Sequence, residues 1–206
     1  EPVSEDDYIR DFTTHVLTCG SDPTRMSKLT ESAAYHDITV TNVFHQSLDT
    51  WGGGTMEGPG GGQKINLILR QLEDLPDHDV VLFTDAYDVF YAMGLDAIIG
   101  RFLGFKHEIV FSAESNLWPD SSLSFPPTHT KYRYLNSGTF IGRVGELKRF
   151  LQPVEDSSDD QLFMQKQFLT GRFNVMLDVE CYLFQTHEMI IVANRDMLFN
   201  AQTQCY

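Results

Sequence analysis

The sequence has no long hydrophobic run, little cysteine and few basic residues for its acidic content. No stretch approaches the roughly 20 consecutive apolar residues that cross a bilayer, so no membrane span is expected. With 15 basic against 29 acidic residues and a net charge of −14, neither nucleic acid nor an anionic membrane is expected as the main partner. A solvated acidic surface and a surface that attracts cations or basic substrates both fit this charge.

The three cysteines also exclude a class of site. Cys19, Cys181 and Cys205 lie far apart and lack the paired spacing of zinc ligands, so no zinc site is expected. Three cysteines form at most one intrachain disulfide, which leaves at least one free thiol. The cysteine count therefore does not decide between an oxidising and a reducing compartment.

What the sequence does contain is enough apolar material for a core. Its 206 residues, 42% of them hydrophobic, most simply form one domain, 1–206. Apolar segments predict strands over 15–19, 37–44, 79–85 and 108–114, and helical periodicity predicts helices over 24–36, 63–75, 95–105, 145–151 and 160–169. This alternation predicts an α/β fold with a mostly parallel central sheet flanked by helices. The seven glycines of 46–62 predict a long loop instead.

A pair of carboxylates ends the apolar run of the third predicted strand. In "FTDAYDV", residues 83–89, Asp85 and Asp88 are three apart with Tyr87 between them. Ligands of open α/β sheets bind at the carboxyl ends of the strands. Two close carboxylates repel unless a cation or proton separates them, and hard oxygen ligands suit Mg²⁺ or Mn²⁺. The alternative is structural, with Asp85 capping a turn and Asp88 facing water.

Four further stretches accompany this one. "GGGQK" (60–64) precedes it, and "FSAESNLWPD" (111–120), "YLNSGTFIG" (134–142) and "DDQLF" (159–163) follow. In this order the five motifs resemble the glycosyltransferase domain of the procollagen lysyl hydroxylase family, over about residues 15–186; procollagen galactosyltransferases are more distant. The resemblance implies a GT-A-type nucleotide-sugar-binding fold and a UDP-sugar-dependent hexosyltransferase that uses Mn²⁺ or Mg²⁺.

The resemblance also implies roles for the donor side of the site. Asp85 and Asp88 match the metal-binding D-x-x-D of the family, and Asp85 also lies close to the nucleotide. Tyr87 matches an aromatic residue that stacks on uracil, Thr18 resembles a uridine contact, and Lys64 resembles a residue that faces the diphosphate. A divalent ion and a lysine would stabilise the charge of the leaving UDP.

Further family positions fall in the glycine-rich loop and in the three later motifs. Trp51 and Met56 match a loop that folds over the donor, and Asn136 resembles part of the turn beneath the transferred sugar. The positions that match the sugar and acceptor pocket are Trp118, Asp159 and Asp160. A carboxylate there can orient sugar hydroxyls or take the acceptor proton.

Each of these residues has an ordinary structural alternative. The tryptophans and Tyr87 can be packing residues, and Lys64 can be a surface lysine. The two acids of "DDQLF" can be the first residues of a helix.

The sequence departs from the family pattern in two places. The family's third metal ligand, a histidine in an "HGN"-like segment, has no counterpart, and His187 lies too early to replace it. Either the chain ends before that segment, or water and phosphate complete the coordination. The second departure is in the family's acidic run before "QLF", which Ser157 and Ser158 interrupt. Nothing in the sequence resembles the iron-dependent hydroxylase portion of the family, so lysine hydroxylation is not predicted.

The resulting hypothesis is a transferase that moves glucose or galactose from UDP-glucose or UDP-galactose to a hydroxylated protein or peptide of collagen-like type. Two alternatives stay open: a transferase of the same fold that acts on a glycan, and a non-catalytic module that binds UDP-sugar. The resemblance places the protein in the lumen of the secretory pathway or outside the cell, with a cytoplasmic location left open.

Overall fold

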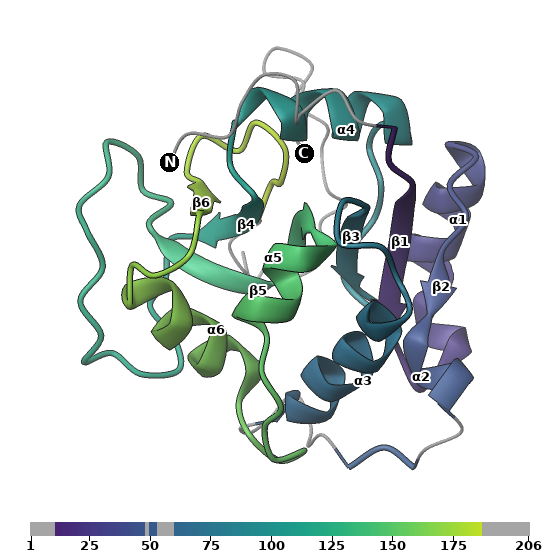
Figure 1. Cartoon of the computed structure of the whole chain (residues 1–206), viewed down its shortest axis with the longest axis horizontal. Coiled ribbons are helices and arrows are strands. Elements are labelled where there is room, and N and C mark those ends of the chain that lie inside the picture. The colour runs from purple at the N-terminus through teal and green to yellow at the C-terminus, as the bar shows by residue number, and fades with distance from the viewer. Residues whose placement is uncertain (1–10, 48–49, 53–59, 187–206) are drawn as a thin grey trace, which may run out of the picture.

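The computed structural model describes residues 11–47, 50–52 and 60–186. In this part of the chain a mixed sheet has the strand order β2-β1-β3-β5-β4-β6 (Figure 1). Its strands are β1 (Thr14–Cys19), β2 (Thr41–Asn42), β3 (Val80–Asp85), β4 (Ile109–Glu114), β5 (Tyr134–Arg143) and β6 (Val175–Asp178). Only β5 runs antiparallel to its neighbours, whereas the other pairs are parallel. The expected mostly parallel α/β sheet is therefore confirmed.

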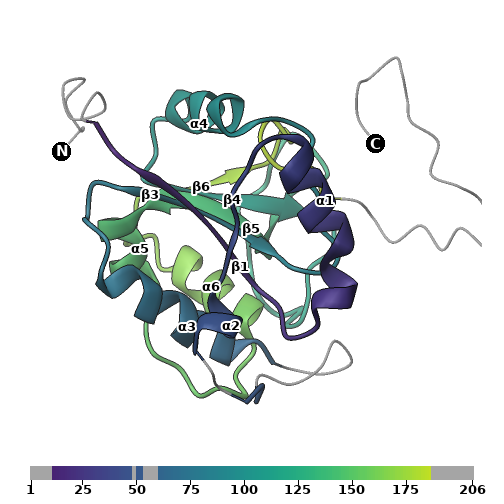
Figure 2. The same cartoon turned by 90° about the vertical axis from the view of Figure 1, so that its right-hand side faces the viewer.

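Helices cover both faces of the sheet. They are the 3₁₀ turn η2 (Pro23–Met26), α1 (Ser27–Tyr35), α2 (Val43–Ser47), α3 (Gly62–Glu73), α4 (Leu95–Gly104), α5 (Val144–Phe150) and α6 (Asp160–Leu169). Figure 2 shows α1 and α4 on one side of the sheet, and α2, α3, α5 and α6 on the other. Among the described residues, no helix has both the length and the apolar character to span a membrane.

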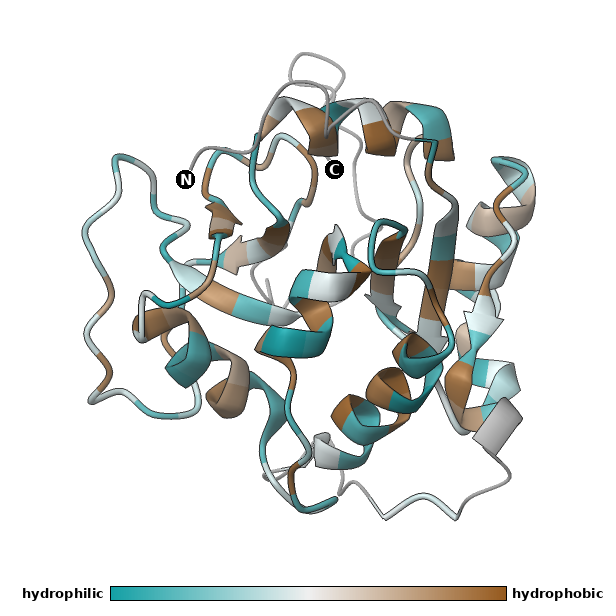
Figure 3. Cartoon of the chain, in the orientation of Figure 1, coloured by the Kyte–Doolittle hydropathy of each residue, from teal (hydrophilic) through white to brown (hydrophobic). Residues whose placement is uncertain are grey.

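Alternation along the central strands builds two separate cores. In β3, Val81 and Phe83 point toward α3, α5 and α6, whereas Val80 and Leu82 point toward α1 and α4. All four are at most 1% exposed, as expected for a strand that is covered on both faces. Figure 3 shows the hydrophobic residues concentrated on the strands and along stripes of the helices.

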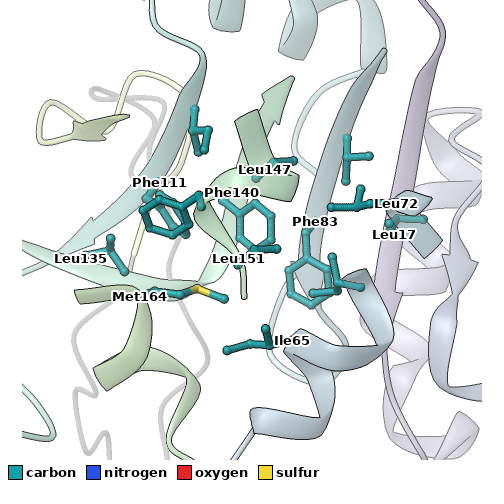
Figure 4. Packing of buried hydrophobic residues seen from close by; sticks show 14 of the residues in the cluster. Leu17, Ile65, Leu72, Phe83, Phe111, Leu135, Phe140, Leu147, Leu151 and Met164 are labelled. Carbon is teal, nitrogen blue, oxygen red and sulfur yellow. The ribbon is translucent and has the colours of Figure 1, made fainter. Parts of the chain in front are cut away.

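The larger core is built around phenylalanine rings that pack against one another (Figure 4). The ring centroid of Phe140 lies 5.1 Å from that of Phe83 and 5.0 Å from that of Phe111, and Phe111 lies 5.3 Å from Phe150. The four residues come from β3, β4, β5 and α5. Their contacts therefore hold the reversed strand β5 between its two neighbours.

One expectation about secondary structure was wrong in extent, and another was confirmed with a different first turn. The strand predicted over 37–44 is only two residues long, because the Asn42 side chain accepts a hydrogen bond from the backbone N–H of Phe44 (3.1 Å) and so starts α2. The helix predicted over 24–36 begins as a 3₁₀ turn, which Asp22 caps by accepting from the N–H of Thr24 (2.9 Å). Strand β6 was not predicted at all.

The directions of the strands bring several strand ends to the same edge of the sheet. The carboxyl ends of β1, β3, β4 and β6 share this edge, and Cys19 stands opposite Asp85 in register. Strand β5 enters from the same edge with a bulge, since Phe111 pairs with Phe140 but the next residue, Ser112, pairs with Asn136. The bulge gathers residues 137–139 at the edge where ligands bind in open α/β sheets.

Phe140→Ala should lower the free energy of unfolding by about 3–5 kcal/mol, because it leaves a cavity at the centre of the ring cluster. Urea denaturation measures this change. The exposed Tyr35 (83% exposed) provides the control, and Tyr35→Ala should change the value by less than about 0.5 kcal/mol. A loss below about 1 kcal/mol for Phe140→Ala would contradict the central role of this ring.

Candidate functional site

A lysine between two carboxylates forms the centre of the site. Lys64 lies in the first turn of α3, Asp85 ends β3, and Asp160 is the first residue of α6. The Lys64 Nζ atom is 2.9 Å from Asp85 Oδ1 and 2.6 Å from Asp160 Oδ2. The side chains of Lys64 and Asp160 are 9% and 13% exposed, whereas that of Asp85 is 35% exposed. The Asp85 carboxylate is thus the member of the cluster that a ligand can reach.

Glycine at position 61 makes this arrangement possible. Gly61 has a φ of +97°, and a Cβ there would overlap the Asp160 carboxylate. Backbone hydrogen bonds from Gly62 to the carbonyl of Ser158 (2.8 Å) and from Asp160 to the carbonyl of Gly60 (3.0 Å) join the start of α3 to the segment that leads into α6. The glycine run therefore brings Lys64 and Asp160 together.

The cluster carries more negative than positive charge. Burial alone would lower the pKa of Lys64, but attraction to Asp160 and Asp85 raises it above its ordinary value. Burial raises the pKa of Asp85 to about 6; Lys64 opposes this rise, while repulsion from Asp160 and Asp88 adds to it. One lysine is shared by two acids, and the exposed Asp88 adds a third negative charge. A further cation would be stabilised here.

Asp85 offers one carboxylate oxygen that would suit a hard divalent ion, with the rest of the coordination supplied by other groups, water or phosphate. Asp85 Oδ1 is engaged by Lys64, but Oδ2 lies 3.0 Å from where a Cβ on Gly138 would stand, so glycine keeps this oxygen accessible. Within the described ranges no group of three His, Cys, Asp or Glu residues has the arrangement of a metal site. His187 lies outside those ranges. The two carboxylates of the D-x-x-D pair suit Mg²⁺ or Mn²⁺, which commonly retain water ligands.

Tyr87 is held by the turn that follows β1. Its hydroxyl oxygen accepts hydrogen bonds from the backbone N–H groups of Ser21 (2.8 Å) and Asp22 (3.0 Å). The guanidinium of Arg25 lies over its ring, 4.4 Å from the centroid. Thr18 is fully buried nearby in β1, and its hydroxyl has no hydrogen-bond partner in the described part of the chain. Their predicted contacts with uridine stay predictions.

The segment around Trp51 is hydrogen-bonded to the start of α3, although residues 53–59 between them are not described. Gln63 accepts a hydrogen bond from the N–H of Gly52 (2.6 Å) and donates one to the carbonyl of Thr50 (2.9 Å). The Trp51 ring packs edge-on against Phe44, with centroids 5.8 Å apart. Met56, predicted to belong to the same loop, lies outside the described residues.

A second polar cluster joins Glu114, at the end of β4, to the predicted acceptor side. Glu114 Oε1 accepts hydrogen bonds from Gln161 (2.8 Å) and Asn136 (3.3 Å). Gln161 also donates to the carbonyl of Trp118 (2.9 Å), whose side chain is 51% exposed. Burial raises the pKa of Glu114, against the effect of these two hydrogen bonds. Asn136 and Trp118 are thus brought together at the edge where Asp85 lies.

The sequence reasoning did not single out Glu114 or the glutamines of α6. The signal for Glu114 was present, because it ends an apolar strand as Asp85 does. The signal for Gln161 was weaker, since a glutamine within a helical segment is usually solvated.

The two acids of "DDQLF" have different partners. Asp159 caps α6 by accepting a hydrogen bond from the N–H of Leu162 (2.7 Å), so the alternative of a helix-start acid describes it well. Burial raises its pKa against that hydrogen bond. Asp160 pairs with Lys64 instead. Whether either also contacts sugar or acceptor stays a prediction.

The architecture and this edge define the class of protein: an α/β domain with an acidic, lysine-bridged cluster where its parallel strands end. Residues 11–204 match the family described as the PLOD GT domain. The chain belongs to this glycosyltransferase family, as its ordered motifs predicted.

Similar proteins include two procollagen lysyl hydroxylases. The chain is 38% identical to human procollagen-lysine,2-oxoglutarate 5-dioxygenase 2 over 166 residues, which are 76% of this chain and 22% of that protein. It is 38% identical to procollagen-lysine,2-oxoglutarate 5-dioxygenase of Drosophila melanogaster over 181 residues, 82% of this chain and 25% of that protein. The chain therefore spans a quarter or less of the length of these two relatives.

Other similar proteins include a viral protein and a solved bacterial structure. Uncharacterized protein R699 of Acanthamoeba polyphaga mimivirus is 38% identical over 165 residues, 76% of this chain and 36% of that protein. Among solved structures, the bifunctional IspDF of Campylobacter jejuni aligns with a TM-score of 0.44 and 11% identity over 80% of this chain and 49% of that chain. A structural likeness of this size carries no argument about function.

Lys64→Met should destabilise the protein in metal-free buffer. It leaves the carboxylates of Asp85 and Asp160 facing each other without their shared cation, at an expected cost of about 1–3 kcal/mol after allowing for the exposure of Asp85. Chemical denaturation in EDTA measures it. Lys28→Met, at an exposed lysine of α1, is the matched control, and an equal effect of both changes would contradict the bridging role of Lys64.

Cys19 should resist alkylation in the folded protein at pH 8. Burial raises the pKa of its thiol to about 12, with Lys64 opposing and Asp85 and Asp160 adding to the rise, and the residue is only 8% exposed. The thiolate is the reactive form. Iodoacetamide treatment followed by peptide mass spectrometry should modify Cys19 in urea but leave it largely free in native buffer. Rapid labelling of Cys19 in native buffer would contradict its burial at the carboxyl end of β1.

Proposed function

We propose that this domain is a metal-dependent hexosyltransferase that moves glucose or galactose from a UDP-sugar to a hydroxylated acceptor. One observation carries the proposal: in a chain of the PLOD glycosyltransferase family, Lys64 joins Asp85 and Asp160 at the carboxyl edge of the sheet, with Asp88 beside them. A nucleotide diphosphate with its divalent ion needs both charges that this cluster supplies, carboxylates for the metal and an ammonium for the phosphate.

The chain's own residues divide between the metal and the donor. Asp85 and Asp88 would hold Mn²⁺ or Mg²⁺, which when bound neutralises charge on the diphosphate leaving group. Lys64 would exchange part of its contact with Asp85 for a phosphate oxygen of the donor. Thr18 and Tyr87 would contact the uridine, and Trp51 and Met56 would belong to the segment that covers the donor.

The acceptor side is formed by the second cluster. The half-exposed Trp118 offers an aromatic face, and Asn136 lies beside Glu114 at the bulge of β5. A carboxylate from Glu114, Asp159 or Asp160 can orient sugar hydroxyls or take the acceptor proton. The raised pKa of Glu114 suits a group that accepts a proton during transfer.

The names of the relatives support a protein acceptor. The human and fly proteins are named for action on procollagen-lysine, so hydroxylated collagen-like protein or peptide is the proposed acceptor of this domain. Such an acceptor would place the protein in the lumen of the endoplasmic reticulum or Golgi, or outside the cell.

Asp88→Asn should reduce Mn²⁺-dependent UDP release from UDP-glucose or UDP-galactose by at least about tenfold, because it removes one carboxylate ligand. Coupled UDP detection with and without a hydroxylysine-containing collagen peptide measures this. Asp37→Asn is the matched control, since Asp37 is exposed and its φ of +55° suits asparagine.

The outcomes separate the candidate functions. Equal turnover in wild type and Asp88→Asn would contradict the metal role of Asp88. Turnover with free sugars but not with the peptide would favour a glycan acceptor. Tight UDP binding without any turnover would favour a non-catalytic binding module.

A further inference from the structure

The inward face of α6 carries two glutamines where apolar residues would be expected. Gln161 and Gln165 are four residues apart, so they lie one above the other on the same helix face. They are 7% and 0% exposed, respectively. A buried amide is costly unless its polar atoms are hydrogen-bonded. The partners of these amides therefore indicate what the pair contributes.

Both amides converge on the backbone carbonyl of Trp118. Its oxygen accepts from Gln161 Nε2 at 2.9 Å and from Gln165 Nε2 at 3.0 Å. The second N–H of Gln165 bonds to the carbonyl of Leu135 (3.0 Å), and that of Gln161 bonds to Glu114 (2.8 Å). All four amide hydrogens are thus used. The pair ties the segment that follows β4 to β5 through α6, which runs beside that segment in Figure 1.

Gln165 acts through its two N–H donors and not through its carbonyl oxygen. Its Oε1 is buried without a hydrogen-bond partner in the described part of the chain. A methionine of similar length would fill the space without this orphan oxygen, but it would supply no donor to Trp118 or Leu135. The side chain has no exposed surface with which to touch a ligand itself, whereas the Trp118 side chain that it serves is 51% exposed.

We propose that Gln165 is a positioning residue for acceptor binding. Together with Gln161 it fixes the carbonyl of Trp118, and so holds the backbone from which the exposed indole projects; a hydroxylated peptide or a sugar would then meet a preorganised aromatic residue. This inference rests on the proposed function and adds to it a residue that positions Trp118 for the acceptor. A purely structural glutamine, present only to satisfy Leu135, would affect stability but neither Trp118 nor the acceptor.

The first measurement follows Trp118 directly and needs no turnover. The chain has two tryptophans, so the Trp51→Phe background leaves Trp118 as the sole indole. In this background Gln165→Met should lower the steady-state fluorescence anisotropy of Trp118 and increase its quenching by acrylamide. Gln167→Met, the same change two residues along α6 at a side chain that is not fully buried, should alter neither. Unchanged signals in folded Gln165→Met would overturn the proposal.

The second measurement separates KM from kcat with Trp51 intact. Gln165→Met should raise the KM for a hydroxylysine-containing collagen peptide about three- to tenfold, the value of one lost hydrogen bond. The Kd for UDP with Mn²⁺ and the kcat should change less than about twofold. A fall in kcat or UDP affinity at constant acceptor KM would overturn the proposal.

Two further controls keep the test decisive. If Gln165→Met does not fold, Gln165→Asn, which keeps the amide but withdraws it by one methylene, is read by the same criteria. If the wild-type domain transfers no sugar to any acceptor, the proposed function fails and the acceptor role fails with it. The fluorescence result then still decides whether Gln165 fixes Trp118, so the two failures are distinguishable.

Discussion

The site depends on one buried ammonium group shared by two carboxylates. Lys64 joins the start of α3, the end of β3 and the start of α6, three segments that are far apart in the sequence. Because one positive charge serves two acids, and Asp88 adds a third, the cluster retains a negative excess. Such an excess is tolerated only where water or a cation reaches it. The partial exposure of Asp85 meets that condition.

The reversed strand β5 brings a second set of groups to the same edge. Its bulge places Gly138 against Asp85 Oδ2 and lets Asn136 reach Glu114. In a wholly parallel sheet, the amino end of a strand would lie at the opposite edge, away from the ends of β3 and β4. The antiparallel strand β5 therefore adds groups from its own amino end to the carboxyl ends of its neighbours.

Helix α6 serves both clusters. Its first residue pairs with Lys64, and two of its buried residues, Gln161 and Gln165, donate hydrogen bonds to Glu114 and to the carbonyl of Trp118. The cap formed by Asp159 fixes where the helix starts. A shift of this helix would move the lysine cluster and the tryptophan together. The two clusters thus share one helix as their support.

The sequence by itself determined the α/β class, the buried character of 79–85 and the position of the Asp pair, because periodicity and strand-end chemistry are local properties. Its ordered motifs also predicted the family. It did not reveal that Asn42 would end β2 after two residues, since that depends on a side-chain cap, nor did it single out Glu114. Only the tertiary structure decided that Lys64 contacts both Asp85 and Asp160, and that two glutamines donate hydrogen bonds to the carbonyl of Trp118. These contacts join residues 21 to 96 positions apart in the chain, and such partners are selected by how strands and helices pack, which no local pattern records.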